Sequence, residues 1–165
     1  MEEKFIIAVY VDNKAGVLSR VTTMFTRRGF NIDAVTAGET ENPECSRITI
    51  AMKGDMYVKE QVINQLKKLL VVKKVAVLEE EPIKRELMLI KVMNKAEFRG
   101  DIMTAVDVFR AGVIDYSPES MCIEVTGSPS KIDAFIKLMQ PFGILEMCRT
   151  GIVALDRGTK TLFSE

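Results

Sequence analysis

The residues best suited to hold a small ligand lie in the segment from Asp12 to Arg20, where a strand-like run passes into a helical one. The first turn of a helix has unpaired backbone N–H groups and a partial positive charge, so it stabilises an anion. Gly16 has no Cβ, which lets a ligand approach the backbone closely. Val17 and Leu18 follow it and offer an apolar wall. The segment therefore indicates a site for a small anion that carries an aliphatic group.

Two asparagines extend this candidate site. Asn13 lies within the loop, and Asn31 follows Gly29, which stands where a helix C-terminal glycine belongs. A side-chain amide can accept a hydrogen bond from an ammonium and donate one to a carboxylate. We expect Asn31 to lie close to the loop in the folded chain, and together these groups suit an α-amino acid with an aliphatic side chain. The alternative is that Asn13 and Gly16 are ordinary turn residues and that Val17 belongs to the core.

The composition argues against catalysis by this chain. Its 165 residues include no histidine, which removes the commonest general base and the commonest metal ligand. Carboxylate or lysine chemistry stays possible, but the sequence shows no cluster of such residues that suits it. The three cysteines Cys45, Cys122 and Cys148 are far apart, form no CxxC pair and are interpreted as small buried apolar residues. We therefore predict no catalytic residue and no metal site.

Charge and hydropathy limit the expected partners. Lys and Arg together number 23, as do Asp and Glu, so the net charge at pH 7 is zero. Proteins that bind nucleic acids or membrane surfaces usually carry a clustered excess of basic residues, which this sequence lacks. No apolar run is long enough to span a bilayer, and the start of the sequence has no signal-peptide layout. We expect a cytoplasmic protein with neither a nucleic-acid nor a membrane partner.

Both halves of the chain show the same order of predicted elements. The first half reads strand, helix, strand, strand, helix, strand, at residues 5–11, 17–28, 31–38, 46–53, 56–70 and 71–78. The second half repeats this order at 87–93, 98–111, 113–116, 121–126, 129–141 and 144–147, with a further extended piece at 151–155. Two βαββαβ units predict an α+β protein built from two ferredoxin-like sandwiches.

The boundary between the halves is predicted from Glu79 to Pro82. Three like charges followed by a proline are typical of a solvated linker. Adjacent acidic residues on an extended chain point in different directions, so we do not interpret this run as a catalytic cluster. We predict one domain at residues 1–80, a second at 84–158, and a loose tail at 159–165.

The whole chain resembles a known family. The segment Asp12-Asn13-x-x-Gly16-Val17-Leu18-x-Arg20-Val21, followed by Phe25 to Gly29 and by Phe30-Asn31-Ile32, is similar to the ACT domain, a ligand-sensing module of amino-acid metabolism. Further motifs resemble one branch of that family, the small subunit of acetohydroxyacid (acetolactate) synthase. These motifs are Arg27 to Ile32, Ser46 to Ile50, Arg85 to Val92, Asp133-Ala134-Phe135, Arg149-Thr150-Gly151 and Arg157-Gly158.

The resemblance implies a regulatory protein that holds no cofactor of its own. In this family two chains pair their ACT domains side by side, and a branched-chain amino acid, valine above all, binds between the loop of one chain and the neighbouring chain. The chain would bind the catalytic (large) subunit, which would hold thiamine diphosphate, Mg²⁺ and FAD. It would raise the activity of that subunit and confer feedback inhibition. By position, the effector-binding residues would be Asn13, Gly16, Val17, Leu18, Asn31 and Ile32.

Three other functions share parts of this pattern. An RNA-binding domain of the RRM type has the same βαββαβ order, but it needs aromatic residues on its central strands, and residues 48–52 include none. A small enzyme of the same fold would need a clustered set of catalytic residues, which the sequence does not show. An ACT-domain sensor that serves another enzyme, or that acts alone, is the remaining alternative.

Overall fold

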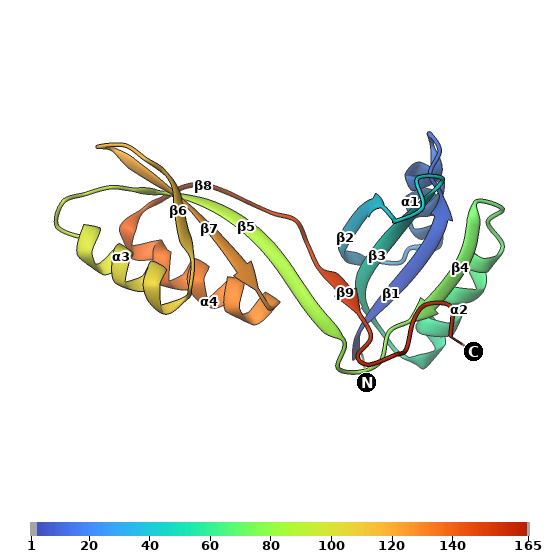
Figure 1. Ribbon diagram of the computed structural model, residues 1–165. Coiled ribbons are helices and arrows are strands. Elements are labelled where there is room, and N and C mark those ends of the chain that lie inside the picture. The colour runs from blue at the N-terminus through green and yellow to red at the C-terminus, as the bar shows by residue number, and fades with distance from the viewer. Residues whose placement is uncertain (1–2, 165) are drawn as a thin grey trace. The chain divides into compact units, whose positions relative to one another are not determined.

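The computed structural model describes residues 3–164, which group into two units (Figure 1). The first unit contains the described residues up to 83 and those from 152 onwards, and the second contains residues 84–151. Each unit has an antiparallel sheet with two helices on one of its faces (Figure 1). The predicted α+β class with two ferredoxin-like sandwiches is therefore confirmed.

The first unit has the predicted element order. Its strands are β1 (Glu3–Asp12), β2 (Ile32–Glu39), β3 (Cys45–Gly54) and β4 (Val72–Val77), and its helices are α1 (Val17–Arg28) and α2 (Met56–Lys67). The sheet order is β2-β3-β1-β4, so β2 and β4 are the edge strands. Because β1 and β2 both run antiparallel to β3, they are parallel to each other.

Local sequence explains where these helices begin and end. Gly16 precedes α1 with a φ of 83°, a left-handed conformation that favours glycine, and Gly29 ends the helix in the same region of φ/ψ space. The side chain of Asp55 caps α2 by accepting a hydrogen bond from the Val58 N–H. On its inner face α1 buries Val17, Val21, Met24 and Phe25 against the sheet.

Both faces of the first sheet are apolar. The helix-covered face of β1 carries Phe5, Ile7, Val9 and Val11. The opposite face belongs to a second buried cluster, which comprises Ile6, Ala8, Ala51, Leu78, Ala154 and Leu162. A continuous apolar strand is typical of a sheet that is covered on both faces. Residues 152–164, which include the short strand β9 (Val153–Leu155), supply the second cover, and we call them the C-terminal strap.

Specific contacts hold the C-terminal strap on the sheet. Phe163 packs edge-on against Tyr10, with their ring centroids 5.0 Å apart. Arg47 donates a hydrogen bond from Nη2 to the Ala154 carbonyl oxygen over 2.8 Å, and burial lowers the pKa of its guanidinium. The sequence predicted that residues 84–158 form the second domain and that 159–165 are a loose tail. In the structure, residues 152–164 belong to the first unit instead. The reason is that the apolar side chains of Ala154 and Leu162 fill the open face of the first sheet.

Residue 165 lies outside the described residues. That residues 1–80 fold by themselves stays a prediction, and the C-terminal strap bears on it. A fragment that ends at residue 80 would leave the alanine-rich face of its sheet without this cover.

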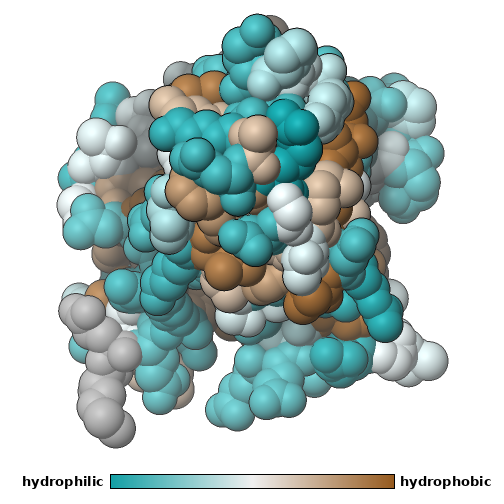
Figure 2. Space-filling model, turned by 90° about the vertical axis from the view of Figure 1, so that its left-hand side faces the viewer, coloured by the Kyte–Doolittle hydropathy of each residue, from teal (hydrophilic) through white to brown (hydrophobic). Residues whose placement is uncertain are grey.

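The second unit repeats the pattern of the first. Its strands are β5 (Ile83–Met93), β6 (Gly112–Tyr116), β7 (Ser120–Gly127) and β8 (Ile144–Arg149). Its helices are α3 (Arg99–Val108) and α4 (Pro129–Met139), and a short 3-10 helix, η1 (Gln140–Phe142), follows α4. The sheet order β6-β7-β5-β8 matches that of the first unit. Large apolar side chains such as Val108 and Ile114 are exposed, and Figure 2 shows hydrophobic residues lying among hydrophilic ones on the face that it draws.

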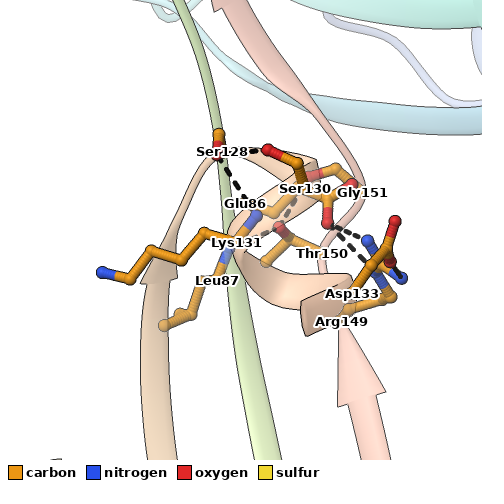
Figure 3. Close-up of polar contacts among 9 residues, drawn as sticks. All are labelled: Glu86, Leu87, Ser128, Ser130, Lys131, Asp133, Arg149, Thr150 and Gly151. Carbon is orange, nitrogen blue, oxygen red and sulfur yellow. Dashed lines mark hydrogen bonds and ion pairs between the residues drawn. The ribbon is translucent and has the colours of Figure 1, made fainter. Parts of the chain in front are cut away.

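An ion-pair network joins three elements of the second unit (Figure 3). Glu86, near the start of β5, is only 5% exposed, and its carboxylate accepts hydrogen bonds from Nε and Nη2 of Arg149 at the end of β8. Arg149 also donates from Nη1 to Asp133 of α4 over 3.0 Å. Beside this network the Thr150 N–H donates to the Leu87 carbonyl oxygen. Because a buried carboxylate is costly without a partner, the Arg149-Thr150 motif has a structural role in this unit.

Loss of the buried leucine of the C-terminal strap should weaken the first unit. Leu162 is 7% exposed, so Leu162→Ala should lower the free energy of unfolding by about 2–4 kcal/mol, through lost burial and the cavity left behind. Leu155→Ala is the matched control, because Leu155 lies in the same strap but is 60% exposed, and its effect should stay below about 1 kcal/mol. Urea denaturation measures both losses, and hydrogen exchange assigns them to a unit. Equal losses for the two variants would contradict a stabilising role of the strap.

Candidate functional site

Asn13, which follows β1, is held by the turn between β2 and β3. Its Nδ2 donates hydrogen bonds to Glu39 Oε2 over 3.1 Å and to the Pro43 carbonyl oxygen over 2.9 Å. Its Oδ1 accepts a hydrogen bond from Ser46 Oγ over 3.0 Å. The backbone N–H of Asn13 donates to the Glu44 carbonyl oxygen. The side chain thus fastens the loop before α1 to the β2–β3 turn.

This loop leads to the N-terminus of α1, which has room for a ligand. Gly16, the N-cap residue of α1, has no side chain that could cap the first backbone N–H groups of the helix. A Cβ built on Gly16 would meet no atom within 4 Å, so open space adjoins its backbone. Since this 12-residue helix has a partial positive charge at its N-terminal end, the arrangement can hold a carboxylate.

The two apolar residues after Gly16 have different surroundings. Val17 is 5% exposed and packs in the core between α1 and the sheet, so its side chain faces away from solvent. Leu18 is 45% exposed, next to the open first turn. Leu18 can therefore contact an aliphatic ligand directly, whereas Val17 fixes the position of the helix start.

Asn31 and Ile32 lie at the opposite end of the sheet from Asn13. Ile32 pairs with Met52 of β3, which in turn pairs with Phe5 near the start of β1. From there to the end of β1 the chain advances by about 23 Å, because a strand rises by about 3.3 Å per residue. The expectation that Asn31 lies close to the loop within one chain is therefore wrong. The physical reason is that α1 returns the chain to the start of the sheet before β2 begins.

Asn31 adjoins a hollow of its own. This hollow has a volume of about 370 Å³ and is lined by the α1–β2 connection and by the β3–α2 connection, including Gly29, Lys53 and Asp55. The candidate residues thus fall into two groups within one chain. We call Asn13, Gly16, Val17 and Leu18 the loop half-site, and Asn31 with Ile32 the β2 half-site.

The structure also brings polar residues to the loop half-site that the sequence did not single out. Glu39 pairs with Ser46 across β2 and β3, which sets both beside Asn13, and only the register of that hairpin reveals it. On β4, Lys73 donates a hydrogen bond to Cys45 Sγ over 3.3 Å, and its Nζ lies 3.2 Å from Asp12 Oδ1. The hydrogen bonds to Cys45 and Asp12 raise the pKa of Lys73.

The cysteines are not all buried. Cys45 is buried as predicted, but Cys122 is only half-buried and Cys148 is exposed, so the prediction is wrong for Cys148. Among residues 3–164, no group of three or more His, Cys, Asp or Glu side chains is arranged to hold a metal ion. Within the same residues, no helix is long and apolar enough to cross a membrane.

Asn13→Asp should loosen the loop half-site. The new carboxylate oxygen would face Glu39 and the Pro43 carbonyl, so two donated hydrogen bonds would become repulsive contacts. We expect the free energy of unfolding at pH 7 to fall by about 1–2 kcal/mol.

The loss should shrink at acidic pH, because repulsion raises the pKa of the two carboxyl groups in the folded state and protonation then favours folding. Asn64→Asp, on the exposed side of α2, is the control. Denaturation at both pH values measures the effect. If the loss of unfolding free energy equals that of the control, or does not depend on pH, the hydrogen bonds of Asn13 do not stabilise this loop.

Two family models match this chain. The model described as "AHAS small subunit-like ACT domain" matches residues 7–74, and the model described as "Small subunit of acetolactate synthase" matches residues 85–158. The matched segments fall in the first and the second unit for most of their length.

Named relatives and a solved structure agree with these matches. A protein of Archaeoglobus fulgidus named "Probable acetolactate synthase small subunit" is 50% identical over 157 residues, which cover 95% of this chain and 99% of that protein. The acetolactate synthase small subunit of Mycolicibacterium smegmatis is 44% identical over 155 residues, or 93% of this chain and 91% of its own. The crystal structure of the acetolactate synthase small subunit from Thermotoga maritima is similar with a TM-score of 0.91 and 41% identity, covering 96% of this chain and 99% of that one.

Proposed function

This chain belongs to the family of acetolactate synthase small subunits, and we propose that it regulates a separate catalytic subunit in response to a branched-chain amino acid, with valine as the first candidate. It then acts in the cytoplasm, raises the activity of the catalytic subunit and confers feedback inhibition, but catalyses no reaction itself. Thiamine diphosphate, Mg²⁺ and FAD belong to the catalytic subunit in this proposal.

The observation that carries the effector proposal is that the two half-sites lie at opposite ends of one edge strand. The start of β2 follows Asn31, and its end, at Glu39, is hydrogen-bonded to Asn13 of the loop half-site. If β2 pairs antiparallel with β2 of a second copy across a two-fold axis, the start of each strand meets the end of the other. Such pairing would bring Asn31 of one copy beside the loop half-site of the other. We therefore propose a homodimer with two effector sites, each formed by both chains.

The composition of the two edge strands favours β2 for this pairing. Between Asp33 and Glu39, β2 carries only small or apolar uncharged residues and Thr36. The other edge strand, β4, carries Lys73 and Lys74. Lysines on an edge strand oppose pairing with an identical strand, because like charges would meet.

The chemistry of such a composite site suits an aliphatic α-amino acid. The N-terminus of α1 would hold the carboxylate, and the exposed side chain of Leu18 would contact the aliphatic group. The amide of Asn31 would bind the zwitterion from the second copy. Asn13 is already bonded to Glu39, Pro43 and Ser46, so we assign it the positioning of the loop. The family match over residues 85–158 favours the synthase over another enzyme as the partner.

The regulatory role can be tested by reconstitution. Acetolactate formation from pyruvate should be absent with this chain alone, present with the catalytic subunit alone, and higher when the two are mixed. Valine should inhibit the mixture more strongly than the catalytic subunit alone. Turnover by this chain by itself, or no stimulation on mixing, would contradict the proposal.

Effector binding can be tested with one substitution in each half-site. Gly16→Asp puts a negative charge at the helix N-terminus, and Asn31→Ala removes a hydrogen bond to a charged ligand, so each should weaken valine binding by about 10- to 150-fold. Gly158→Asp controls for backbone strain, because Gly158 also has a positive φ (68°) and open space around it. Asn64→Ala controls for loss of an amide.

Calorimetry with valine and melting temperatures of all four variants make the comparison. Wild-type valine affinity in well-folded Gly16→Asp and Asn31→Ala would remove both half-sites from effector binding. The two variants should still stimulate the catalytic subunit, because stimulation depends on docking of the subunits and not on the effector.

A further inference from the structure

We propose that the outer edge of β4 binds an extended, acidic segment of a partner protein as an added strand. A groove with a volume of about 390 Å³ runs along this edge, between β4, the end of α2 and the C-terminal strap. This edge is the one that the proposed dimer leaves open, and it holds none of the candidate effector residues. The inference therefore stands independently of the effector site.

The backbone of β4 presents hydrogen-bonding groups to this groove. The Leu78 N–H donates to the Ile6 carbonyl oxygen on β1, and Ala76 pairs with Ala8 two residues further along. In an antiparallel ladder the residues between such hydrogen-bonded pairs point their N–H and C=O groups away from the partner strand. Val75 and Val77 occupy these intermediate positions, and both line the groove. An extended segment can therefore add to β4 through these groups.

The charged residues around the groove favour a segment with negative charge. Four lysines line it, Lys67, Lys73, Lys74 and Lys160, against one acidic residue, Asp156. The Asp156 carboxylate already accepts a hydrogen bond from the Glu79 N–H over 2.8 Å. Asp12 and Glu79 pair with Lys73 and Lys160, so four lysines face three carboxylates in all. The groove keeps a small positive excess, which would attract an acidic segment.

Two of these lysines are fixed in place and two are available. Lys160 binds Glu79 Oε1 over 2.7 Å, and Lys73 is held by Asp12 and Cys45, as described above. The hydrogen bond to Glu79 raises the pKa of Lys160, which keeps its ammonium charged. Among residues 3–164, no ion pair involves Lys67 or Lys74. These two ammonium groups can thus pair with carboxylates of an added strand.

The same lysines exclude a second copy of this chain from the β4 edge. Antiparallel pairing of β4 with another β4 would bring the Lys73-Lys74 pairs of both copies close together, which is unfavourable. A strand that alternates acidic and apolar residues would instead oppose lysines with carboxylates. With its carboxylates on the face of Lys74, its apolar side chains would lie on the helix-covered face, to which Val72 belongs. The geometry thus favours an acidic partner strand over self-association.

The proposal is tested with synthetic peptides and the full chain. The probe is a capped peptide of alternating Val and Glu. One control peptide has Lys in place of Glu, and another keeps Glu but is N-methylated at alternate residues, so that it cannot complete a strand ladder. Calorimetry in the absence of valine and of the catalytic subunit measures binding to this chain alone. If the peptide does not bind, the proposed regulation of the catalytic subunit is not affected. If that regulation is not found, the result on peptide binding still stands.

We expect the Val–Glu peptide to bind, to bind more weakly as salt rises, and to lose about tenfold in affinity with Lys67→Glu combined with Lys74→Glu. The matched control is Lys131→Glu with Lys137→Glu on α4 of the second unit, which should leave binding unchanged. Equal binding of the Lys peptide or of the N-methylated peptide would overturn the proposal. So would unchanged binding in the β4 variant. Displacement of the peptide by inorganic triphosphate, with no loss on N-methylation, would assign the groove to small anions instead.

Discussion

The antiparallel ladder between β1 and β3 determines where every candidate ligand group of the first unit can lie. It runs from Glu3 opposite Gly54 to Asp12 opposite Cys45 without a shift in register. A slip of one residue would turn each side chain of β1 to the other face of the sheet. The two faces differ in volume, because large side chains such as Phe5 and Ile7 face the helices, whereas the opposite face is rich in alanine. The helix layer fits only the first face, and a thin extended strap fits the second.

This ladder also separates the two half-sites. α1 has 12 residues and is about 18 Å long, so it carries the chain from the end of β1 back to the start of β2. Because β1 and β2 are parallel, the loop before α1 and the connection after it lie at opposite ends of the sheet. One chain therefore cannot join the two proposed half-sites by itself. In the proposed dimer, a two-fold axis at the β2 edge joins them, so that binding of the proposed effector would depend on dimerisation.

The sequence predicted the elements of both units well because their periodicities are strong. The apolar residues of α1 recur at helical spacing and end at Gly29, and the same order of elements occurs twice. The return of the C-terminal strap to the first sheet could not be predicted, since only a few residues of that segment, such as Leu162, are buried. The continuous apolar run of β1 is typical of a strand that is covered on both faces, but it carries no information about which segment covers the second face.

The candidate site was predictable in its parts but not in its arrangement. Gly16 and the open helix start follow from local sequence, and the structure has both. The bonds of Asn13 to Glu39 and Ser46 depend on the register of a hairpin that begins 19 residues after Asn13. The distance of Asn31 from the loop depends on the direction of β2, which a helix–strand pattern alone does not give. Long-range register is therefore the information that local patterns lack.

A site formed by both chains predicts how many valine molecules a mixed dimer binds, and one measurement tests this number directly. Chains with Gly16→Asp and chains with Asn31→Ala, carrying different affinity tags, are co-expressed, and the mixed dimer is isolated through both tags. If each site takes its loop half-site from one chain and its β2 half-site from the other, the mixed dimer has one intact site and one doubly altered site. Calorimetry should then find one valine bound per mixed dimer with wild-type affinity, while neither parent homodimer binds at that affinity. A mixed dimer that binds valine no better than its parents would contradict a site shared between two chains.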